Sequence, residues 1–446
     1  MHSRVPAPQN KPRILLSLSA ITWICVIYVL FALSYAGITP YRTAGILPNQ
    51  GYQLDIGAPD ERQHVNYIRT LAHERRFPVF GEGEGYETYQ SHQPPIYYIL
   101  SAPLSIFAGT ENLEKEKWAL RGFNILIGLF LILGVFRLTN RVTQNSNIAS
   151  FCAGFVGLLP MMIALSSAVT NDVMLYLMIV LTLNVLIDCL LEGWTIKRSI
   201  FLGCLLGIGI LTKTSFLLVI PTVLCAMTLW KDYRPRFYIA IYAFLIGLVI
   251  YFPWMMRNVH LYGDPLAMKM FVEQFHTFPA SLGIERSGVF GYWYEWVFLR
   301  AVWSFWGVFS YFELNFPMYW YWMLSVPALL GFAVGKIYLF KSKFDACKQL
   351  TVLNTVLFAF VLIAFIRFNM IYFQAQARYL LPAILFFVFP IAIGLHQIDR
   401  WLFKSNEEKQ GKILFAFFLT LLVFANLYVL FYLLPVGFHG MVGDSY

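Results

Sequence analysis

The chain has 446 residues, of which 59% are hydrophobic, 18% aromatic and only 13% charged. This composition excludes an ordinary soluble protein and is typical of a polytopic membrane protein. The formal net charge of +9 does not indicate nucleic-acid binding, because Lys and Arg lie in short clusters between apolar runs. Six cysteines are scattered without paired spacing, so we expect packing residues rather than disulfides or metal ligands.

The N-terminal region carries Arg4, Lys11 and Arg13, followed by an apolar stretch from Ile14 to about Gly37. This stretch is long for a signal peptide and no clear cleavage site follows it, so we expect an uncleaved first span. Further apolar runs are long enough to cross a bilayer, which takes roughly 17 to 25 residues. They predict an all-α bundle of about eleven spans, near 14–37, 119–138, 148–168, 173–191, 199–212, 214–230, 237–256, 319–340, 350–371, 379–397 and 412–434.

Two other apolar stretches, 94–109 and 289–317, are interrupted by Pro or by charges and aromatics. We assign them to the membrane interface or to re-entrant packing. The fifth and sixth predicted spans are short and meet at Lys213. We interpret residues 1–446 as a single transmembrane domain.

Loop charges predict the topology. With a cytoplasmic N-terminus every inner loop is basic, whereas the short outer connections carry only Lys213, Arg367 and Arg378. Two long segments then lie on the outer face and hold most of the acids there. We call 38–118 the first long segment and 257–318 the second long segment. Loops of this length in a compact membrane protein are usually functional.

The stretch PDERQHVNYI, residues 59–68, places ionised groups directly after the first span. Pro59 suits the first position of a helix, and Asp60 and Glu61 suit its first turn, where the helix dipole favours carboxylates. The dipole would also help to keep Asp60 ionised, as a general base requires. Because His64 follows Asp60 by four residues, the two would share one face of the helix.

Apolar residues at helical spacing, Val65, Ile68 and Ala72, predict an amphipathic helix over 59–75 on the membrane surface. The alternative interpretation is that Asp60 and Glu61 are only favourable helix-start residues on a solvated face.

A series of short motifs extends this pattern along the chain. In order they are PDERQHVNYIRTLA, HQPPIYYIL, ALRGFNILIG, SSAVTND, ILTKTS, PWMMRNVHLYGDP, SFWGVF and QARYLLPA. The series resembles the GT-C superfamily of polytopic glycosyltransferases, which includes protein O-mannosyltransferases and the aminoarabinose transferases of lipid A. The later motifs are most similar to a less characterised bacterial branch, and the resemblance covers roughly residues 14–400.

The resemblance implies roles for several residues. An acidic pair in the first outer loop of that superfamily supplies the candidate catalytic base, here Asp60 followed by Glu61. The superfamily's Lys-Pro-Pro or His-Pro-Pro element is similar to Gln93-Pro94-Pro95 with His92 before it, although Gln93 cannot hold a phosphate by charge. Its outer Asp after the third span and its Leu-Thr-Lys element match two further residues, Asp172 and Lys213.

Transfer from a polyprenyl-phosphate sugar needs a base for the acceptor hydroxyl and positive charge for the departing phosphate. We predict Asp60 as the base and Lys213, Arg257 and Arg378 as the cations, with His64, His92, Gln93 and Asp172 around the substrate. Each has a simpler alternative. Lys213 could snorkel, Arg257 could end a helix, Arg378 could form a structural ion pair, Asp172 could cap a helix, and the histidines could be structural.

A metal ion is not firmly implied. Asp60, Glu61 and His64 could hold a divalent cation, but the chain has neither an H-E-x-x-H motif nor a cysteine-based site. We interpret Glu82, Glu84 and Glu87 as a solvated acidic turn. An aromatic-rich segment, 289–322, resembles an interfacial belt, with sugar stacking as the alternative. Its tryptophans are Trp293, Trp296, Trp303, Trp306, Trp320 and Trp322.

These patterns predict a glycosyltransferase in a bacterial inner membrane, with its active site on the outer face. The donor would be a polyprenyl-phosphate sugar among membrane lipids, the acceptor a glycan, lipid or protein, and inversion of configuration comes with the resemblance. The alternative is a lipid-linked substrate flippase or a secondary transporter. A transporter should show internal repeats and ionisable residues near the middle of its spans, and we find neither in the sequence.

Overall fold

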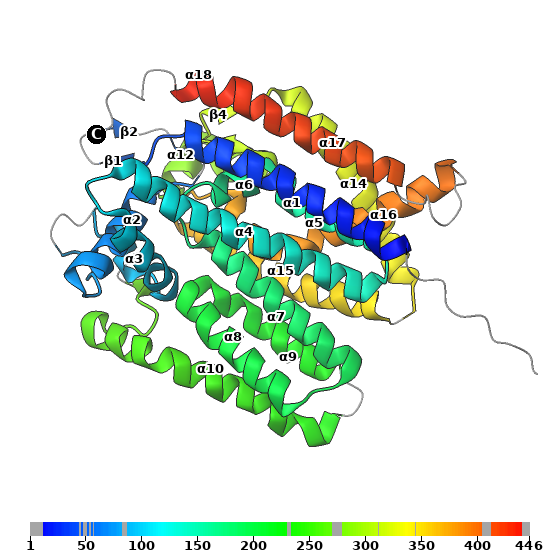
Figure 1. The fold of residues 1–446 in the computed structure, drawn as a ribbon, viewed down its shortest axis with the longest axis horizontal. Helices are drawn as coiled ribbons and strands as arrows, with labels where there is room; N and C mark the ends of the chain where they lie inside the picture. The colour runs from blue at the N-terminus through cyan, green and yellow to red at the C-terminus, as the bar shows by residue number, and fades with distance from the viewer. Residues whose placement is uncertain are drawn as a thin grey trace, which may run out of the picture.

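The computed structural model describes residues 12–43, 46–47, 51–52, 55–56, 58–82, 87–229, 233–269, 279–310, 312–343, 345–403 and 412–438. Long apolar helices run side by side through these regions, and the strands form two short antiparallel ribbons (Figure 1). The helices are α1 (Pro12–Ile38), α2 (Glu61–Arg69), α3 (Ile96–Ala108), α4 (Leu113–Thr143), α5 (Ser146–Leu158), α6 (Pro160–Ser166), α7 (Asp172–Glu192), α8 (Ile196–Thr212), α9 (Ile220–Thr228), α10 (Tyr233–Tyr262), α12 (Ala280–Gly291), α13 (Arg300–Trp306), α14 (Met318–Lys341), α15 (Ala346–Ile371), α16 (Leu385–Phe403), α17 (Lys412–Tyr428) and α18 (Leu434–Phe438). The strands are β1 (Ile46–Leu47), β2 (Gly51–Tyr52), β3 (Val308–Phe309) and β4 (Leu314–Asn315).

Short 3-10 or π-helical segments adjoin or connect several of these helices. They span Thr70–Glu74, Tyr89–His92, Thr214–Val219, Tyr292–Leu299, Ala377–Tyr379, Leu381–Ala383 and Val429–Leu433.

The predicted spans all coincide with helices, but their number is not confirmed. Within the described residues, 8 helices are long and apolar enough to cross a membrane, or up to 9 if α5 and α6, bent by 62°, form one span. The bend lies at Leu159–Pro160, where Pro160 begins the second helix of the pair. The predicted fifth span corresponds to α8, whose 17 residues are at the lower limit for a crossing. The sixth corresponds to Thr214–Thr228, which is shorter than a full crossing.

Close packing through glycine holds α14 against α16. A Cβ atom on Gly394 of α16 would lie 1.8 Å from the carbonyl oxygen of Gly331, and one on Gly335 would lie 1.9 Å from the carbonyl oxygen of Pro390. Gly331 and Gly335 are four residues apart on α14, so the backbones meet along a small-residue face of the kind common between membrane helices. A similar close contact at a glycine joins α8 to α10, where a Cβ on Gly207 would lie 2.6 Å from the Cβ of Ile250.

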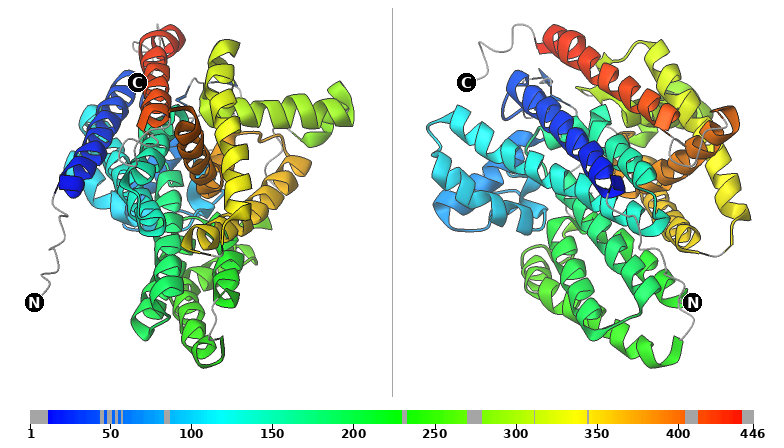
Figure 2. Two further views of the ribbon diagram at one scale, coloured as in Figure 1. Left: turned by 90° about the vertical axis from the view of Figure 1, so that its right-hand side faces the viewer. Right: turned by 45° about the vertical axis from the view of Figure 1, so that its right-hand side comes forward.

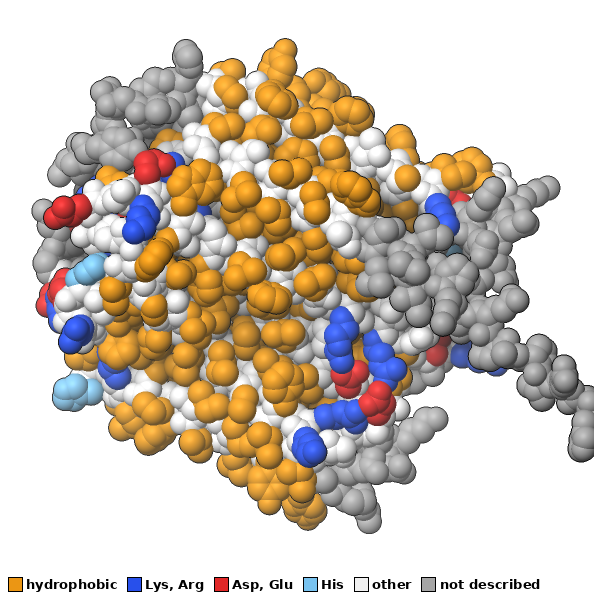
Figure 3. Space-filling view, viewed as in Figure 1, with side chains coloured by type: hydrophobic (Ala, Val, Ile, Leu, Met, Phe, Trp, Pro, Cys, Tyr) orange, Lys and Arg blue, Asp and Glu red, His pale blue; other side chains and the backbone are white. Residues whose placement is uncertain are grey.

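Apolar side chains cover the middle of the molecule, whereas charged side chains gather at its two ends (Figure 3). Many large apolar residues along the long helices are exposed, among them Phe130, Val249, Leu329 and Phe340. Because no water-facing protein gains by exposing so much apolar surface, this belt is the lipid-facing surface of a polytopic membrane protein.

The first long segment packs over one end of the bundle, where α2 and α3 lie together (Figure 1). Its amphipathic helix differs from the prediction in two ways. The helix begins at Glu61 rather than Pro59, and Asp60 precedes it in a left-handed conformation with φ 71°. Its residues are also buried on more than one face, including Gln63, His64 and Tyr67. The helix is therefore enclosed by α3 and its neighbours and does not lie open on a membrane surface.

Candidate functional site

Three segments far apart in the sequence bring charged side chains together. Asp172 opens α7, Lys213 follows the last residue of α8, and Arg378 lies in the loop between α15 and α16. Lys213 Nζ lies 2.5 Å from Asp172 Oδ1, and Arg378 Nη1 lies 3.8 Å from Asp172 Oδ2. We call these three residues the Asp172 cluster. Its two cations face one carboxylate, which leaves the cluster with net positive charge.

Asp60 lies within the electrostatic reach of this cluster. Burial raises the pKa of Asp60 from 3.8 to about 6, while Arg378 and Lys213 act to lower it and Asp172 to raise it. Among the described residues, its carboxylate accepts one side-chain hydrogen bond, a long one of 3.4 Å from Gln90 Nε2. A carboxylate that titrates near neutrality and has few hydrogen bonds is suited to accept a proton.

The backbone at Asp60 is in a conformation that few residues other than glycine adopt. Its φ of 71° is left-handed, and its side chain forms no capping bond to the helix that follows. Asp tolerates this region better than most residues, yet the conformation still carries strain. Strained residues of this kind concentrate at functional sites.

Both histidines of the predicted site are held neutral. His64 Nδ1 lies 2.8 Å from the hydroxyl of Tyr98, and burial followed by the charge of Lys213 lowers its pKa to about 3. His92 Nδ1 lies 2.8 Å from the carbonyl oxygen of Tyr89 and therefore carries the proton, since a carbonyl only accepts. Burial lowers the pKa of His92 to about 4. This geometry favours the structural alternative for both residues.

Gln93 joins the first long segment to the Asp172 cluster. Its Oε1 accepts a hydrogen bond of 3.3 Å from Asn171 Nδ2, which also donates to the carbonyl oxygen of Thr212 at 3.2 Å. Asn171 precedes Asp172 and Thr212 precedes Lys213. Gln93 therefore helps to set the positions of both charged residues, a role that needs an amide rather than a cation.

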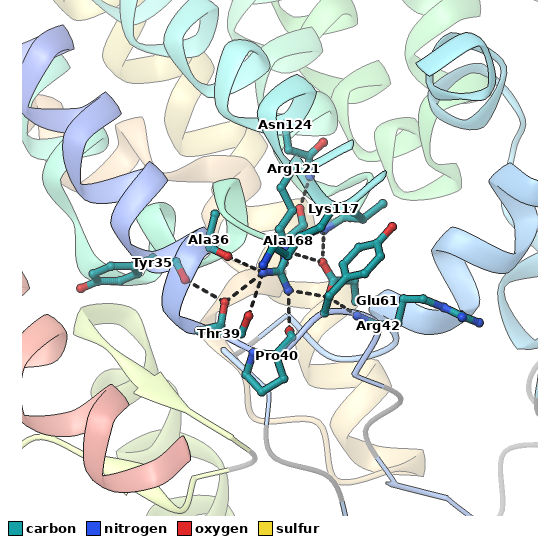
Figure 4. Close-up of polar contacts among 12 residues, drawn as sticks. Tyr35, Ala36, Thr39, Pro40, Arg42, Glu61, Lys117, Arg121, Asn124 and Ala168 are labelled. Carbon is teal, nitrogen blue, oxygen red and sulfur yellow. Dashed lines mark hydrogen bonds and ion pairs between the residues drawn. The ribbon is translucent and has the colours of Figure 1, made fainter. Parts of the chain in front are cut away.

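Glu61 forms a buried ion pair with Arg121 of α4 (Figure 4). Arg121 Nε and Nη2 donate to its two oxygens at 2.8 and 2.7 Å. The same oxygens also accept from the backbone N–H groups of Val169 and Arg42, each at 2.9 Å. Both side chains are 1% exposed. The catalytic role predicted for Glu61 does not fit this geometry, because its oxygens are already occupied.

Arg121 uses its remaining N–H groups on the end of α1. It donates to the carbonyl oxygens of Ala36, Thr39 and Pro40 at 2.7, 3.0 and 2.6 Å (Figure 4). The Glu61–Arg121 pair thus connects α1, α2, α4 and the loop before α7. Arg121 was not predicted as a site residue, although an Arg inside the predicted span 119–138 is a signal that could have identified it.

Arg257 lies apart from the Asp172 cluster. Its Nη2 donates to the carbonyl oxygen of Pro78 at 2.7 Å, and its guanidinium lies 4.4 Å from the ring centre of Trp254. These contacts dock α10 onto the first long segment, as expected for a residue near the end of a helix. Its Nη1 is buried and has no hydrogen-bond partner among the described residues.

A narrow cavity lies beside Asp60. Its lining includes Asp55, Pro59, Ser304, Phe312 and Gln376. Pro59 precedes Asp60, and Gln376 precedes Arg378 by two residues, so the cavity is lined by sequence neighbours of the acid and of one cation of the cluster. The Oε1 atom of Gln376 is buried without a hydrogen-bond partner among the described residues, an uncommon state for a native protein.

The other predicted features are distributed as follows. Within the described part of the chain, no group of three His, Cys, Asp or Glu side chains could hold a metal ion. Glu82 and Glu87 form ion pairs with Arg76 and Arg62 at 2.7 and 2.6 Å, whereas Glu84 lies outside the described residues. The aromatic segment is mixed, since Trp306 and Trp320 are buried and Trp322 is exposed.

Comparison with known sequences finds one family. Residues 91–256 match the sequence profile of the family described as dolichyl-phosphate-mannose-protein mannosyltransferase. This range begins at the HQPP motif and ends just before Arg257. No curated protein sequence matches the chain.

Solved structures with a similar fold include two membrane transferases. The oligosaccharyltransferase of Archaeoglobus fulgidus, solved with a tethered acceptor peptide, is 15% identical over 93% of this chain and 55% of its own, with a TM-score of 0.53. In its complex with an inhibitory peptide and a dolichol-phosphate, the same enzyme is 14% identical over 93% of this chain and 55% of its own, with a TM-score of 0.50. ArnT from Cupriavidus metallidurans, bound to undecaprenyl phosphate, is 13% identical over 93% of this chain and 74% of its own, with a TM-score of 0.54.

The chain spans about half the length of the archaeal enzyme, so the likeness to that enzyme concerns the fold. The fold extends over 93% of this chain in both relatives, and the family match covers the segment that contains Gln93, Asp172 and Lys213. The chain therefore shares the fold of these transferases over most of its length, and its residues 91–256 are similar to the mannosyltransferase family.

Proposed function

We propose that this protein transfers a sugar from a polyprenyl-phosphate-linked donor to an acceptor hydroxyl, with Asp60 as the general base. The observation that carries the proposal is the proximity of Asp60 to the Asp172 cluster, expressed in the effects of Lys213 and Arg378 on its pKa. A base for the acceptor and positive charge for the leaving group are the two requirements of this reaction. Asp60 and the two cations of the cluster would supply them, and sequence neighbours of Asp60 and Arg378 line one narrow cavity.

In this proposal Asp60 takes the proton of the acceptor hydroxyl while the hydroxyl oxygen attacks the anomeric carbon of the sugar. The bond from that carbon to the phosphate oxygen breaks, and the lipid phosphate departs with the negative charge. Lys213 and Arg378 stabilise this charge. Attack from the side opposite the phosphate would invert the configuration, in line with the inverting mechanism that we predict.

The solved relatives support a lipid-phosphate donor, since one binds undecaprenyl phosphate and the other dolichol-phosphate. The location supports an enzyme over the alternative of a flippase or secondary transporter. Asp172 opens its helix and Lys213 follows the end of another, whereas transport sites lie near the middle of the spans. We place this site on the outer face of a bacterial inner membrane, with a cytoplasmic N-terminus.

The decisive test is Asp60→Asn, assayed by sugar transfer from a polyprenyl-phosphate donor in membranes with matched protein levels. Transfer should fall by at least a hundredfold, the usual contribution of a general base. Glu111→Gln is the matched control, because Glu111 is an exposed acid of the same segment. Transfer by Asp60→Asn at the wild-type rate would remove Asp60 as the base. Flux of a lipid-linked sugar across vesicles without product would favour the transporter instead.

A further inference from the structure

The second long segment contains a short helical stretch with two different faces. Phe290, Tyr294 and Phe298 are 80%, 47% and 57% exposed, and their rings stack in sequence at 5.6 and 6.3 Å. The part of the chain that holds them projects from the side of the bundle (Figure 2). The opposite face carries Tyr292, which is fully buried, and Arg300.

Arg300 begins α13 on this inward face. Its guanidinium carbon lies 5.1, 5.3 and 5.2 Å from the ring centres of Trp296, Phe312 and Phe373. These rings come from three separate segments of the chain, so the tertiary structure builds the aromatic enclosure. Cation–π contacts of this kind attract the guanidinium to the ring faces and hold the planar group in a fixed orientation.

No described residue gives Arg300 an acidic partner or a hydrogen-bond acceptor. The acids nearest in sequence, Glu295 and Glu313, are exposed and do not pair with it. Burial lowers the pKa of Arg300, which shows that its charge is partly removed from water. By contrast, Arg121 satisfies its N–H groups completely. Arg300 is thus a half-buried cation whose N–H groups have no acceptor among the described residues and are accessible to an anion.

The aromatic enclosure adjoins the candidate site. Phe312 both stacks on Arg300 and lines the cavity next to Pro59 and Gln376. Phe373 belongs to the loop that continues to Gln376 and Arg378. An anion bound at Arg300 would therefore lie near the cavity that Phe312 and Pro59, the residue before Asp60, both line.

We infer that Arg300 binds a phosphate group carried by a lipid. A guanidinium fixed in its plane suits the bidentate recognition of phosphate. The exposed rings of Phe290, Tyr294 and Phe298 are of the kind that lies at the membrane interface, at the depth of lipid phosphates. Two sources share this chemistry, the polyprenyl phosphate of the donor and an ordinary anionic phospholipid. The polyprenyl phosphate is favoured because the enclosure borders the cavity. This inference rests on the proposed function for the identity of that donor.

The test uses the full chain in phosphatidylcholine nanodiscs and measures equilibrium binding of undecaprenyl phosphate. Arg300→Gln should weaken binding on the order of tenfold, the value of about one charge-assisted hydrogen-bonded contact. Arg300→Lys should lose less, because it keeps the charge but not the planar fork. Arg286→Gln is the matched control, since Arg286 is an exposed arginine of α12, and it should bind as the unmodified chain does.

A second arm replaces part of the phosphatidylcholine with phosphatidylglycerol. If the polyprenyl carrier is the ligand, the tenfold loss in Arg300→Gln persists in both discs. If the loss disappears in phosphatidylglycerol discs, ordinary phospholipid occupies Arg300 and the inference is overturned. It is also overturned if Arg300→Gln binds undecaprenyl phosphate with unchanged affinity while its melting temperature shows an intact fold. Asp60→Asn should keep this binding while losing transfer, so failure of the proposed function is observed separately.

Discussion

At the scale of single residues, the neighbouring acids Asp60 and Glu61 differ sharply in their hydrogen bonding. Asp60 has one weak side-chain hydrogen bond and a raised pKa, whereas Glu61 is saturated by Arg121 and two backbone N–H groups. The backbone at Asp60 is left-handed. Glu61 anchors the loop that carries Asp60, and the few hydrogen bonds of Asp60 suit the base that we propose.

The pH dependence of transfer follows from the raised pKa of Asp60. A base must be ionised, so kcat/KM should fall about tenfold per pH unit below pH 6 and level off above it. His64 and His92, with pKa values of about 3 and 4, do not titrate in that range. Initial rates between pH 4.5 and 8 measure the effect, and a flat profile would contradict a base with this pKa.

The contribution of Asp60 to folding stability should fall as pH rises, whereas transfer should increase. A carboxyl whose pKa is raised on folding stabilises the protein when protonated, fully below its unfolded value of 3.8, and this contribution is lost as pH rises through about 6. Asp60→Asn should therefore raise the melting temperature at pH 7.5 and leave it nearly unchanged at pH 4. A lower melting temperature at pH 7.5 would show that the ionised carboxylate stabilises the loop.

The Glu61–Arg121 pair should behave as one buried unit. Glu61→Gln or Arg121→Gln alone leaves a buried charge without its partner, at a cost of about 3–5 kcal/mol. The double replacement Glu61→Met with Arg121→Met should cost less than the two single replacements added together. Thermal unfolding of the unmodified chain, the two single variants and the double variant gives the coupling free energy between the two side chains. Purely additive losses of stability would mean that they do not act as a pair.

The sequence predicted the residues of the site better than their roles. The resemblance pointed to Asp60, Asp172 and Lys213, and the need for positive charge pointed to Arg378. Asp172 contacts both cations, and Asp60 lies within their electrostatic influence. Their catalytic and binding roles stay predictions. The partner of Glu61 was not foreseen, because it depends on carbonyl groups at the end of α1 and on a turn before α7 that meet only in the folded bundle.

At the scale of helices, apolar runs located the elements but not their lengths or bends. The break at Leu159–Pro160 lies inside the predicted span 148–168, and α8 with Thr214–Thr228 falls short of two crossings. Helical periodicity also predicted the amphipathic helix of the first long segment. Its burial could not be predicted, because the covering helix α3 has no charge pattern that indicates where it docks.

The glycine contacts between α14 and α16 give a test at this scale. Gly394→Ala places a methyl group 1.8 Å from the carbonyl oxygen of Gly331, so the helices must separate, at a cost of roughly 1–3 kcal/mol. Gly122→Ala in α4 is the control, because its added Cβ meets no atom within 4 Å and Ala favours a helix. Thermal unfolding in detergent compares them, and equal stability of the two variants would argue against close contact.

At the scale of the whole molecule, the two charged ends and the apolar belt define a membrane protein, while its orientation rests on the loop charges. Cysteine labelling can determine it. Glu111→Cys should react with a membrane-impermeant maleimide in intact spheroplasts, and Lys197→Cys only after permeabilisation. Both positions are exposed, and the described native cysteines are buried or partly buried. The reverse pattern would place the site on the cytoplasmic face.

The buried Glu61–Arg121 pair also has a consequence for how the protein matures. Its groups come from the end of α1, the start of α2, α4 and the turn at Val169, which leave the ribosome in that order. The loop around Asp60 cannot reach its final geometry until the chain has been made and inserted as far as α7. A partly synthesised chain in the membrane therefore holds Asp60 without its folded surroundings, and the activity that we propose would begin only once the bundle has assembled.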